Sequence, residues 1–181
     1  AGEGGRLVLS VDSDFQGVLA GIRGAHAQNN WLGAEYAEVV ERLHASSPAP
    51  IPRCDSTKGS DSIGFSYHSV EVFWVDSDPG GSRKLVAGEV GYSIGATYTS
   101  MTGFMDKADP RFSHCGTLQL LALGRLLERC GYSFWNLGHP PDPAKGRMLY
   151  KADIGGRSVP RSEFLASWMT QRKGSPSTGC S

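Results

Sequence analysis

The chain has 181 residues, a length typical of one domain with a substantial core. Hydrophobic residues make up 39% of it, and no apolar run approaches the roughly 20 residues that cross a bilayer, so the sequence excludes a membrane-spanning helix. Basic residues (18) balance acidic ones (18), but residues 1–106 hold 7 basic against 13 acidic side chains, and residues 107–181 hold 11 against 5. The C-terminal half therefore carries the excess positive charge that an anion such as RNA would meet.

The four cysteines (Cys54, Cys115, Cys130 and Cys180) lie far apart and form no C-x-x-C pair. This spacing argues against a zinc ribbon or a dense disulfide framework and favours buried or inert thiols in a reducing compartment. The first residues show neither an initiating methionine nor a signal-peptide pattern. We therefore expect a processed or trimmed chain that is cytoplasmic or organellar rather than secreted.

The N-terminal third predicts one strand and two helices. Residues 6–11 (RLVLSV) read as a short strand, after which Asp12 or Ser13 can cap a helix over 14–27. A second helix is predicted over 33–46, with a turn at 28–31 between the two. The residues expected to face inward are Phe15, Val18, Leu19 and Ile22 of the first helix and Tyr36, Val39, Val40 and Leu43 of the second.

The middle of the chain predicts a loop and then an antiparallel meander. Residues 47–62 are rich in proline, serine and aspartate, which favours a mobile loop. Residues 65–76 alternate as a strand does, residues 77–83 form a hairpin-type turn, and residues 84–104 supply one or two further strands. Gly88, Gly91 and Gly95 interrupt these runs and indicate bulges or close backbone approach.

The last third predicts helix, strand and helix. Ser113 or Thr117 can begin a leucine-rich helix over 117–130 that we expect to be largely buried, and Gly131 ends it. A strand over 132–137, a turn over 138–146 and a closing helix over 159–170, with Pro160 in its first turn, follow. We expect residues 1–173 to form one domain and residues 174–181 a disordered tail.

This order predicts an α/β (α+β) architecture, a mixed and mostly antiparallel sheet flanked by helices, which resembles the GNAT-like acyltransferase fold. Four phrases sharpen the resemblance: AHAQNNWL (25–32), HSVEVFWVD (68–76), LVAGEVGYSIG (85–95) and DIGGRSVPRSEFL (153–165). In order and spacing, over residues 7–168, they are similar to the C-terminal catalytic domain of the leucyl/phenylalanyl-tRNA-protein transferases. That family's smaller N-terminal domain has no counterpart in this sequence.

The resemblance implies a reaction and its partners. An aminoacyl-tRNA would donate Leu, Phe or Met to the N-terminal amino group of an acceptor protein, marking it for turnover. No metal or bound cofactor is needed for that chemistry. It needs an apolar pocket, a polar clamp on the aminoacyl nitrogen and a route for one proton.

The sequence departs from the family at its carboxylates. Asn136 and Gly138 stand where the family has the aspartate and glutamine of D-x-Q, and Met101 stands where it has a glutamate. The hydroxyl of Thr102 is retained, so we expect Asn136 and Thr102 in catalysis. Substrate contacts are expected from Tyr98, Met101, Phe104, Gly138 and Tyr150, the last of which stands where the family often has histidine.

His139 has two interpretations. It can cap a turn through a backbone carbonyl, or it can replace the missing base at the end of a strand, where ligands tend to bind in α/β sheets. Four basic residues, Lys145, Arg147, Lys151 and Arg157, could meet the acceptor end of tRNA, although each alone could simply face water. We expect Glu71 and Glu89 to be structural partners of Arg161 or another buried arginine.

Three functions are compatible with these patterns. We favour a working aminoacyltransferase over a catalytically inactive domain that serves as a binding or structural subunit of a larger assembly. An acyl-CoA-dependent acetyltransferase is the weakest of the three, because the loop FSHCGT (112–117) lacks the glycine pattern whose amides hold pyrophosphate.

Overall fold

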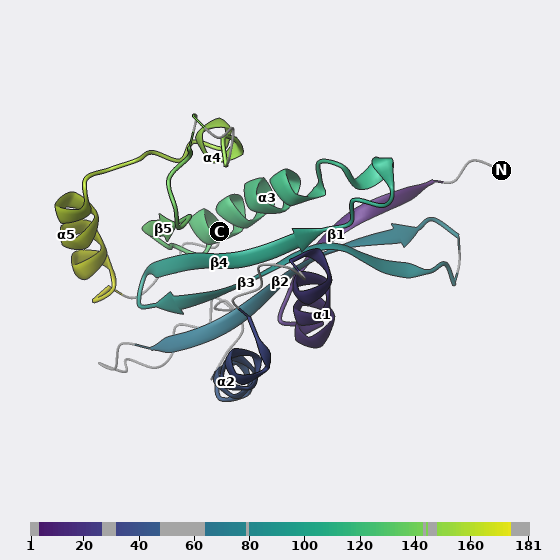
Figure 1. Cartoon of the computed structure of the whole chain (residues 1–181), viewed down its shortest axis with the longest axis horizontal. Coiled ribbons are helices and arrows are strands. Elements are labelled where there is room, and N and C mark those ends of the chain that lie inside the picture. Colours follow the sequence, from purple (N-terminus) through teal and green to yellow (C-terminus); the bar gives the residue numbers. More distant parts are fainter. Residues whose placement is uncertain are drawn as a thin grey trace.

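A computed structural model describes residues 4–26, 32–47, 64–78, 80–142, 144 and 148–174. Its centre is a five-stranded sheet in the order β1-β2-β3-β4-β5 (Figure 1). The strands are β1 (Gly5–Val11), β2 (Phe65–Asp76), β3 (Arg83–Ile94), β4 (Thr97–Met105) and β5 (Phe134–Asn136). The first four pair antiparallel, and β5 pairs parallel with β4. The predicted mixed, mostly antiparallel sheet is confirmed and is compatible with a GNAT-like fold.

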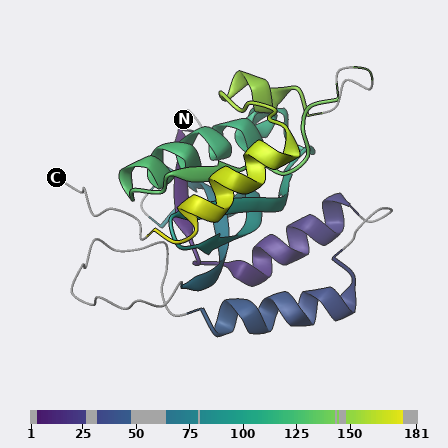
Figure 2. The same cartoon turned by 90° about the vertical axis from the view of Figure 1, so that its left-hand side faces the viewer.

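Helices cover both faces of this sheet. On one face lie α1 (Phe15–Ala25) and α2 (Ala34–Ala45), and α3 (Cys115–Arg129) lies on the other, as Figures 1 and 2 show. The short helices η1 (Pro110–Phe112) and α4 (Tyr150–Asp153) and the closing helix α5 (Arg161–Gln171) complete the fold. No helix in the described ranges has the length and apolar content needed to cross a membrane.

Two cores therefore lie back to back on the sheet. The first holds the predicted inward residues of α1 against β2 and β3: Phe15, Val18, Leu19, Ile22, Tyr67 and Val90. The second holds Val70, Tyr98, Leu123 and Leu127 against the other face, and the adjoining cluster of Val72, Val86 and Phe112 extends it. Because the sheet separates the two cores, side chains of β4 that point to opposite faces cannot contact each other.

The helix boundaries needed small corrections. Asp14, rather than Asp12 or Ser13, caps α1, because its carboxylate accepts the Gly17 N–H at 2.9 Å. Pro160 stands at the N-cap of α5, one residue before the helical turn in which it was predicted. The helix α3 begins at Cys115 and its N-cap is His114.

Burial is narrower on α2 and α3 than the leucine and valine content predicted. Of the four inward positions expected on α2, Val40 is buried, whereas Tyr36 and Val39 are 62% and 53% exposed. The helix α3 presents one stripe to the sheet, formed by every fourth residue, so Leu118 and Leu121 remain exposed. The stripe is Cys115, Gln119, Leu123 and Leu127.

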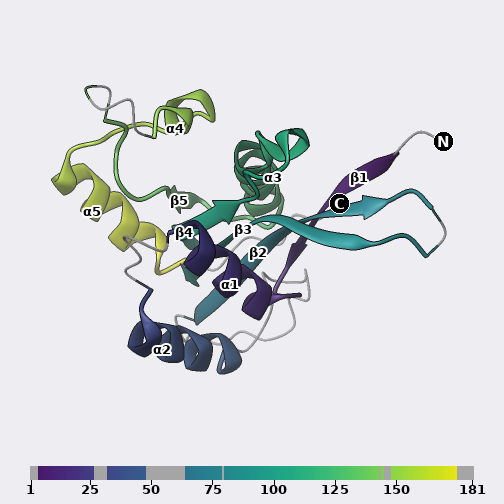
Figure 3. The ribbon, with the colours of Figure 1, turned by 45° about the vertical axis from the view of Figure 1, so that its right-hand side comes forward.

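The hairpin of β2 and β3 extends along β1 away from α5 (Figure 3). Gly131 ends the α3 segment with a φ of 75°, as predicted, and the chain returns as β5. At the other end α5 lies beside β5, where Phe164 meets Phe134 edge to face with 5.5 Å between ring centroids. The predicted turn at 28–31, all but the first residue of the predicted loop 47–62 and all but the first residue of the tail 174–181 lie outside the described residues.

Candidate functional site

The parallel pair β4 and β5 places its carboxyl ends together. Pairing stops at Thr99 and Asn136, after which β4 continues and the chain leaves β5 through Leu137 and Gly138. Ligands of α/β sheets tend to bind beyond the carboxyl ends of parallel strands. Three of the sequence-predicted residues, Asn136, Gly138 and His139, lie in this segment.

The segment after β5 is a turn held by Asn136. Its Oδ1 accepts the Gly138 N–H at 2.9 Å, the Asx geometry that asparagine favours. Gly138 has a φ of +76°, a left-handed conformation that glycine adopts without strain. Glycine at this position is therefore explained by the backbone, and Asn136 has a positioning function in addition to any contact with substrate.

Lys151 fixes the same turn from α4. It is buried, and its ammonium donates to the carbonyls of Leu137 (2.6 Å) and His139 (2.8 Å) and contacts Met148 Sδ at 3.4 Å. Burial lowers the pKa of Lys151. These contacts use all three N–H donors of the ammonium group. Lys151 therefore holds the turn, whereas the sequence had suggested a contact with tRNA.

The side chain of His139 is exposed, and only the backbone carbonyl of this residue accepts a hydrogen bond from Lys151. The imidazole makes no hydrogen bond to the part of the chain that the structure describes. The predicted contact of the ring with a backbone carbonyl is therefore not observed, and the interpretation as a base stays a prediction.

A buried carboxyl group on β3, that of Glu89, is the next feature of this region. The sequence had predicted that it would pair with an arginine. Glu89 of β3 is 5% exposed, and its Oε1 accepts the hydroxyls of Ser100 at 2.8 Å and Tyr98 at 3.2 Å. Trp135 of β5 donates its Nε1–H to Ser100 Oγ at 3.0 Å. The sequence signal for this group was a glutamate among apolar residues of a predicted strand. Its hydroxyl partners could not be identified from the sequence, because they lie on another strand.

Burial perturbs this carboxyl strongly. Desolvation raises the pKa of Glu89 from 4.5 to about 7, against the lowering effect of the Ser100 and Tyr98 hydrogen bonds. The phenol pKa of Tyr98 is raised well above its ordinary value by burial and by the Glu89 charge. Partial burial and the Glu89 charge also raise the pKa of Tyr150, a phenol at the start of α4 that is 39% exposed. Glu89 therefore binds Tyr98 and lies near Tyr150, two of the residues predicted to bind substrate.

Met101 and Phe104, by contrast, belong to the opposite face of the sheet. A bulge interrupts the pairing of β3 and β4, because Gly91 is paired with Ser100 and Val90 with Thr102, which leaves Met101 unpaired. The extra residue reverses the alternation beyond it. Met101 Sδ accepts the Tyr67 hydroxyl at 3.2 Å, and Phe104 packs on the α1 core.

The expectation that Tyr98, Met101 and Phe104 together form one apolar substrate pocket is therefore wrong. Tyr98 is fully buried in the α3-side core, so it packs rather than lines an opening. Thr102, the predicted catalytic hydroxyl, is half-buried beside the bulge and makes no hydrogen bond within the described residues.

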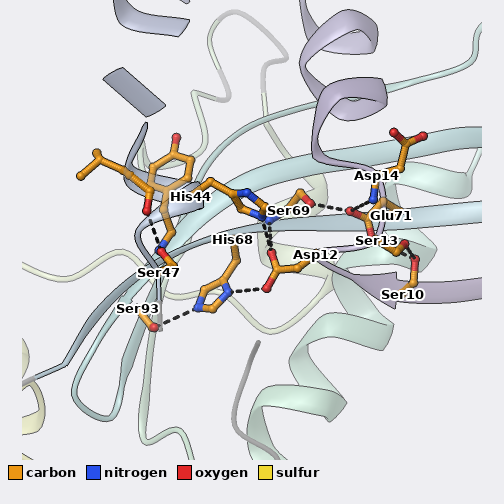
Figure 4. Close-up of polar contacts among 12 residues, drawn as sticks. Ser10, Asp12, Ser13, Asp14, His44, Ser47, His68, Ser69, Glu71 and Ser93 are labelled. Carbon is orange, nitrogen blue, oxygen red and sulfur yellow. Dashed lines mark hydrogen bonds and ion pairs between the residues drawn. The ribbon is translucent and has the colours of Figure 1, made fainter. Parts of the chain in front are cut away.

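A second polar network lies deeper in the sheet, and Figure 4 shows it in detail. His68 lies between Asp12 and Ser93: Nδ1 is 2.9 Å from Asp12 Oδ2, and Nε2 is 3.1 Å from Ser93 Oγ. Asp12 Oδ1 also accepts the Ser69 N–H at 2.8 Å and lies 3.2 Å from His44 Nε2. Sequence reasoning missed this network, which joins β1, β2, β3 and α2.

The order serine, histidine, aspartate resembles that of a nucleophilic triad. In this network, however, the serine is not accessible to a substrate. His68 is 1% exposed, the Tyr98 ring stacks on its imidazole, and the Ser93 hydroxyl is hydrogen-bonded to Tyr132 as well as to His68. A nucleophile needs room beside its oxygen for the carbonyl that it attacks. The network therefore serves the architecture.

Glu71 is likewise held by hydroxyls and not by an arginine. Its carboxylate accepts hydrogen bonds from Ser10 and Ser69 and from Ser13, and from the Asp14 N–H (Figure 4). No salt bridge joins Glu71 or Glu89 to an arginine within the described residues. The predicted pairing with Arg161 is wrong, and Arg161 is exposed at the start of α5.

The predicted RNA contacts are placed unevenly. Arg157 is exposed in the loop before α5, where it can meet a phosphate. Lys145 and Arg147 lie outside the described residues. A hollow of about 520 Å³ lies between α1 and α2, lined in part by Arg23 and Glu41, on the face opposite Glu89.

The mixed sheet with helices on both faces thus defines an α+β protein whose unusual carboxyl group lies beside the β4–β5 pair. The chain is similar to a leucyl/phenylalanyl-tRNA–protein transferase of Paracoccus denitrificans, with 24% identity over 155 residues. The match covers 86% of this chain and 55% of the relative, so the chain spans about half the length of that protein. No model of a protein family matches the chain.

Proposed function

We propose that this protein is an aminoacyltransferase that moves Leu, Phe or Met from aminoacyl-tRNA to the N-terminal amino group of an acceptor protein. The observation that carries the proposal is the similarity to a transferase of that name along 86% of the chain. The four phrases that resemble the family support it, as does a fold compatible with acyl transfer. On this proposal residues 1–173 act as one domain, and the product is a protein marked for turnover.

The described residues offer several of the groups that the reaction needs. Asn136 can orient a substrate amide or hydroxyl, because its NH₂ remains available while Oδ1 holds the turn. Tyr150 supplies an aromatic ring at the start of α4 that is 39% exposed. Arg157 supplies positive charge, which binds phosphate without reading sequence.

The carboxylates missing at the positions of Asn136 and Met101 favour a second candidate, an inactive domain kept as a binding or structural subunit. Removal of a general base typically lowers a rate by about 100- to 10,000-fold. Such a domain would still bind aminoacyl-tRNA or a neighbouring subunit. Binding alone therefore does not separate the two functions, and transfer does.

The test is transfer of radiolabelled Leu, Phe or Met from charged tRNA to a protein with an N-terminal Arg or Lys, using the full-length protein. We expect label in the acceptor, and none when the acceptor's N-terminus is acetylated. Folded protein that binds charged tRNA but transfers none of the three amino acids would establish the inactive domain instead. His139→Ala, assayed alongside, tests the base predicted from the sequence.

A further inference from the structure

We propose that Glu89, supplied by β3, is the carboxyl group that accepts the proton of the attacking amine in this protein. The inference rests on the proposed function and names a residue other than Asn136 and Met101, the two positions at which the family's carboxylates are missing. It requires that the carboxyl be held in place, lie at the candidate site and have a free oxygen.

The carboxyl is held in place by two neighbouring strands. Ser100 and Tyr98 both donate to Oε1, and the Ser100 oxygen is itself fixed by the indole of Trp135. A hydroxyl that donates to a carboxylate and accepts from a fixed indole has little freedom to rotate. Glu89 is therefore oriented before any substrate arrives.

The carboxyl also lies at the end of the β4–β5 pair. A Cβ added at Gly138 would lie 3.9 Å from the Ser100 carbonyl, which puts the turn after β5 next to the residue that binds Glu89. Tyr150 of α4 lies close enough for the Glu89 charge to raise its pKa. Glu89 thus brings a carboxyl group from β3 to the face of the sheet that Tyr98 and the turn after β5 share.

One oxygen of Glu89 remains for chemistry. Both hydrogen bonds end on Oε1, and Oε2 accepts none from the described part of the chain. The groups that titrate around it are Tyr98 of β4 and Tyr150 of α4, both phenols that are neutral at pH 7. No cation of the described residues pairs with Glu89 to hold it in the charged form.

The step balances without a cofactor. The neutral amine of the acceptor attacks the ester carbonyl carbon, forming the C–N bond, and Glu89 Oε2 takes one proton from that nitrogen. As the tetrahedral intermediate collapses, the bond between the carbonyl carbon and the ribose oxygen breaks, and the same proton passes to that oxygen. The free tRNA and the extended protein leave with the carboxylate restored.

The protonation state suits this function. A carboxyl whose pKa is about 7 is partly ionised at neutral pH and is a far better proton acceptor than one at 4.5. An N-terminal amine has a pKa of about 7.7 to 8.0, so part of it is neutral and able to attack at the same pH. The proton acceptor and the nucleophile are therefore both present in their reactive forms near neutral pH.

The experiment compares Glu89→Gln with unmodified full-length protein in the transfer assay. We expect kcat to fall by about 100- to 10,000-fold with little change in KM for aminoacyl-tRNA. Glu163→Gln, the same change at an exposed position of α5, is the control for the loss of one charge and should retain the rate. Circular dichroism and urea unfolding establish that Glu89→Gln is folded.

Two further measurements keep the inference testable if Glu89→Gln folds poorly. Ser100→Ala removes a hydrogen bond that lowers the pKa of Glu89, so the rising limb of the pH–rate profile should move to higher pH. A ¹³C NMR titration of the glutamate carboxyls should show one group titrating near pH 7 that disappears in Glu89→Gln. A limb that stays in place, or no glutamate titrating near pH 7, would overturn the inference.

The failures are distinguishable. Absence of transfer by the unmodified protein removes the proposed function and this inference with it. Transfer by the unmodified protein that persists undiminished in Glu89→Gln removes this inference alone. A large loss of kcat in His139→Ala with none in Glu89→Gln assigns the base to the exposed imidazole.

Discussion

The phenol ring of Tyr98 stacks on the imidazole of His68, with 6.3 Å between ring centroids and 28° between ring planes. The hydroxyl of the same tyrosine donates to Glu89. Tyr98 therefore contacts both buried polar networks, one centred on Asp12 and the other on Glu89. Gly91 makes room for this arrangement, because a Cβ there would lie 2.5 Å from the Tyr98 oxygen.

Buried polar networks of this kind have a large effect on stability in either direction. Fully hydrogen-bonded, they fix one arrangement of the strands, whereas a single lost partner leaves a desolvated group. The turn after β1 and the four strands β2 to β5 contribute to the two networks here. Their energetics can be measured separately from any transfer activity.

The first prediction concerns the pH dependence of stability. Below pH 4.5 Glu89 is protonated in the folded and unfolded chain alike, so it contributes nothing. Between pH 4.5 and about 7 the unfolded chain releases the proton while the folded chain keeps it, so stability falls as pH rises. A difference of 7 minus 4.5 corresponds to roughly 3 kcal/mol in total.

Glu89→Gln removes that titration. We expect the variant to gain roughly 3 kcal/mol relative to the unmodified protein between pH 4.5 and pH 8, measured by urea unfolding at both values. Glu163→Gln should show no such gain. Parallel pH profiles for the unmodified protein and Glu89→Gln would mean that the carboxyl titrates at its ordinary pKa.

The second prediction concerns Asp12, which has a φ of 54° and links His68, His44 and the Ser69 N–H. Asp12→Ala removes these hydrogen bonds, each worth about 1.5 to 3 kcal/mol when one partner is charged, and leaves alanine in a left-handed conformation. We expect a loss of at least about 3 kcal/mol. Asp12→Asn should lose less, because asparagine tolerates this conformation and can still accept from Ser69.

The acid side of the stability profile checks the same residue. Burial works to raise the pKa of Asp12, but the hydrogen bonds of His68 and Ser69 outweigh it and lower the pKa. A lowered carboxyl pKa contributes stability above its unfolded value of about 3.9, and that stability is lost as pH falls through the folded value. Asp12→Asn should therefore unfold with a flatter dependence below about pH 4 than the unmodified protein.

The order of strands and helices could be predicted because its signals are local. Alternation in residues 65–76, the turn that follows and the apolar face of α1 each depend on neighbouring residues only. Exposure on α3 could not be predicted, because leucines at all positions look alike until the sheet selects one stripe. The expectation of a largely buried helix is therefore wrong at Leu118 and Leu121, which are exposed.

The site was harder to predict because it depends on pairing between strands. The bulge at Met101 is defined by the register of β3 on β4, and it places Phe104 on the face opposite Tyr98. Glu89 was predicted to pair with an arginine. Strand alternation shows which face of the sheet a carboxyl occupies, but it does not show which side chains of the neighbouring strands lie on that face. Tyr98 and Ser100, the partners of Glu89, are about ten residues away in sequence and adjacent only in the sheet.

The third prediction tests the close approach at Gly91. An added Cβ would lie 2.5 Å from Tyr98 Oη and 2.6 Å from the Thr99 carbonyl, so Gly91→Ala must displace the strand or the phenol. We expect a loss of about 1 to 3 kcal/mol, typical of overpacking. Gly24→Ala is the control, since nothing lies within 4 Å of its added Cβ in α1 and alanine favours helix by up to about 1 kcal/mol. Equal effects of the two changes would contradict the packing of Tyr98 on β3.

The fourth prediction separates a structural lysine from an RNA-facing arginine. Lys151→Met removes the ammonium that holds the carbonyls of Leu137 and His139, so we expect a loss of about 1 to 3 kcal/mol and faster hydrogen exchange at the Gly138 amide. Arg157→Ala should leave stability within about 0.5 kcal/mol, because the side chain is exposed. Its effect should appear in tRNA binding, as weaker affinity and a salt dependence reduced by about one phosphate contact. Unchanged stability in Lys151→Met, together with a lower salt dependence, would instead place that lysine on the nucleic acid.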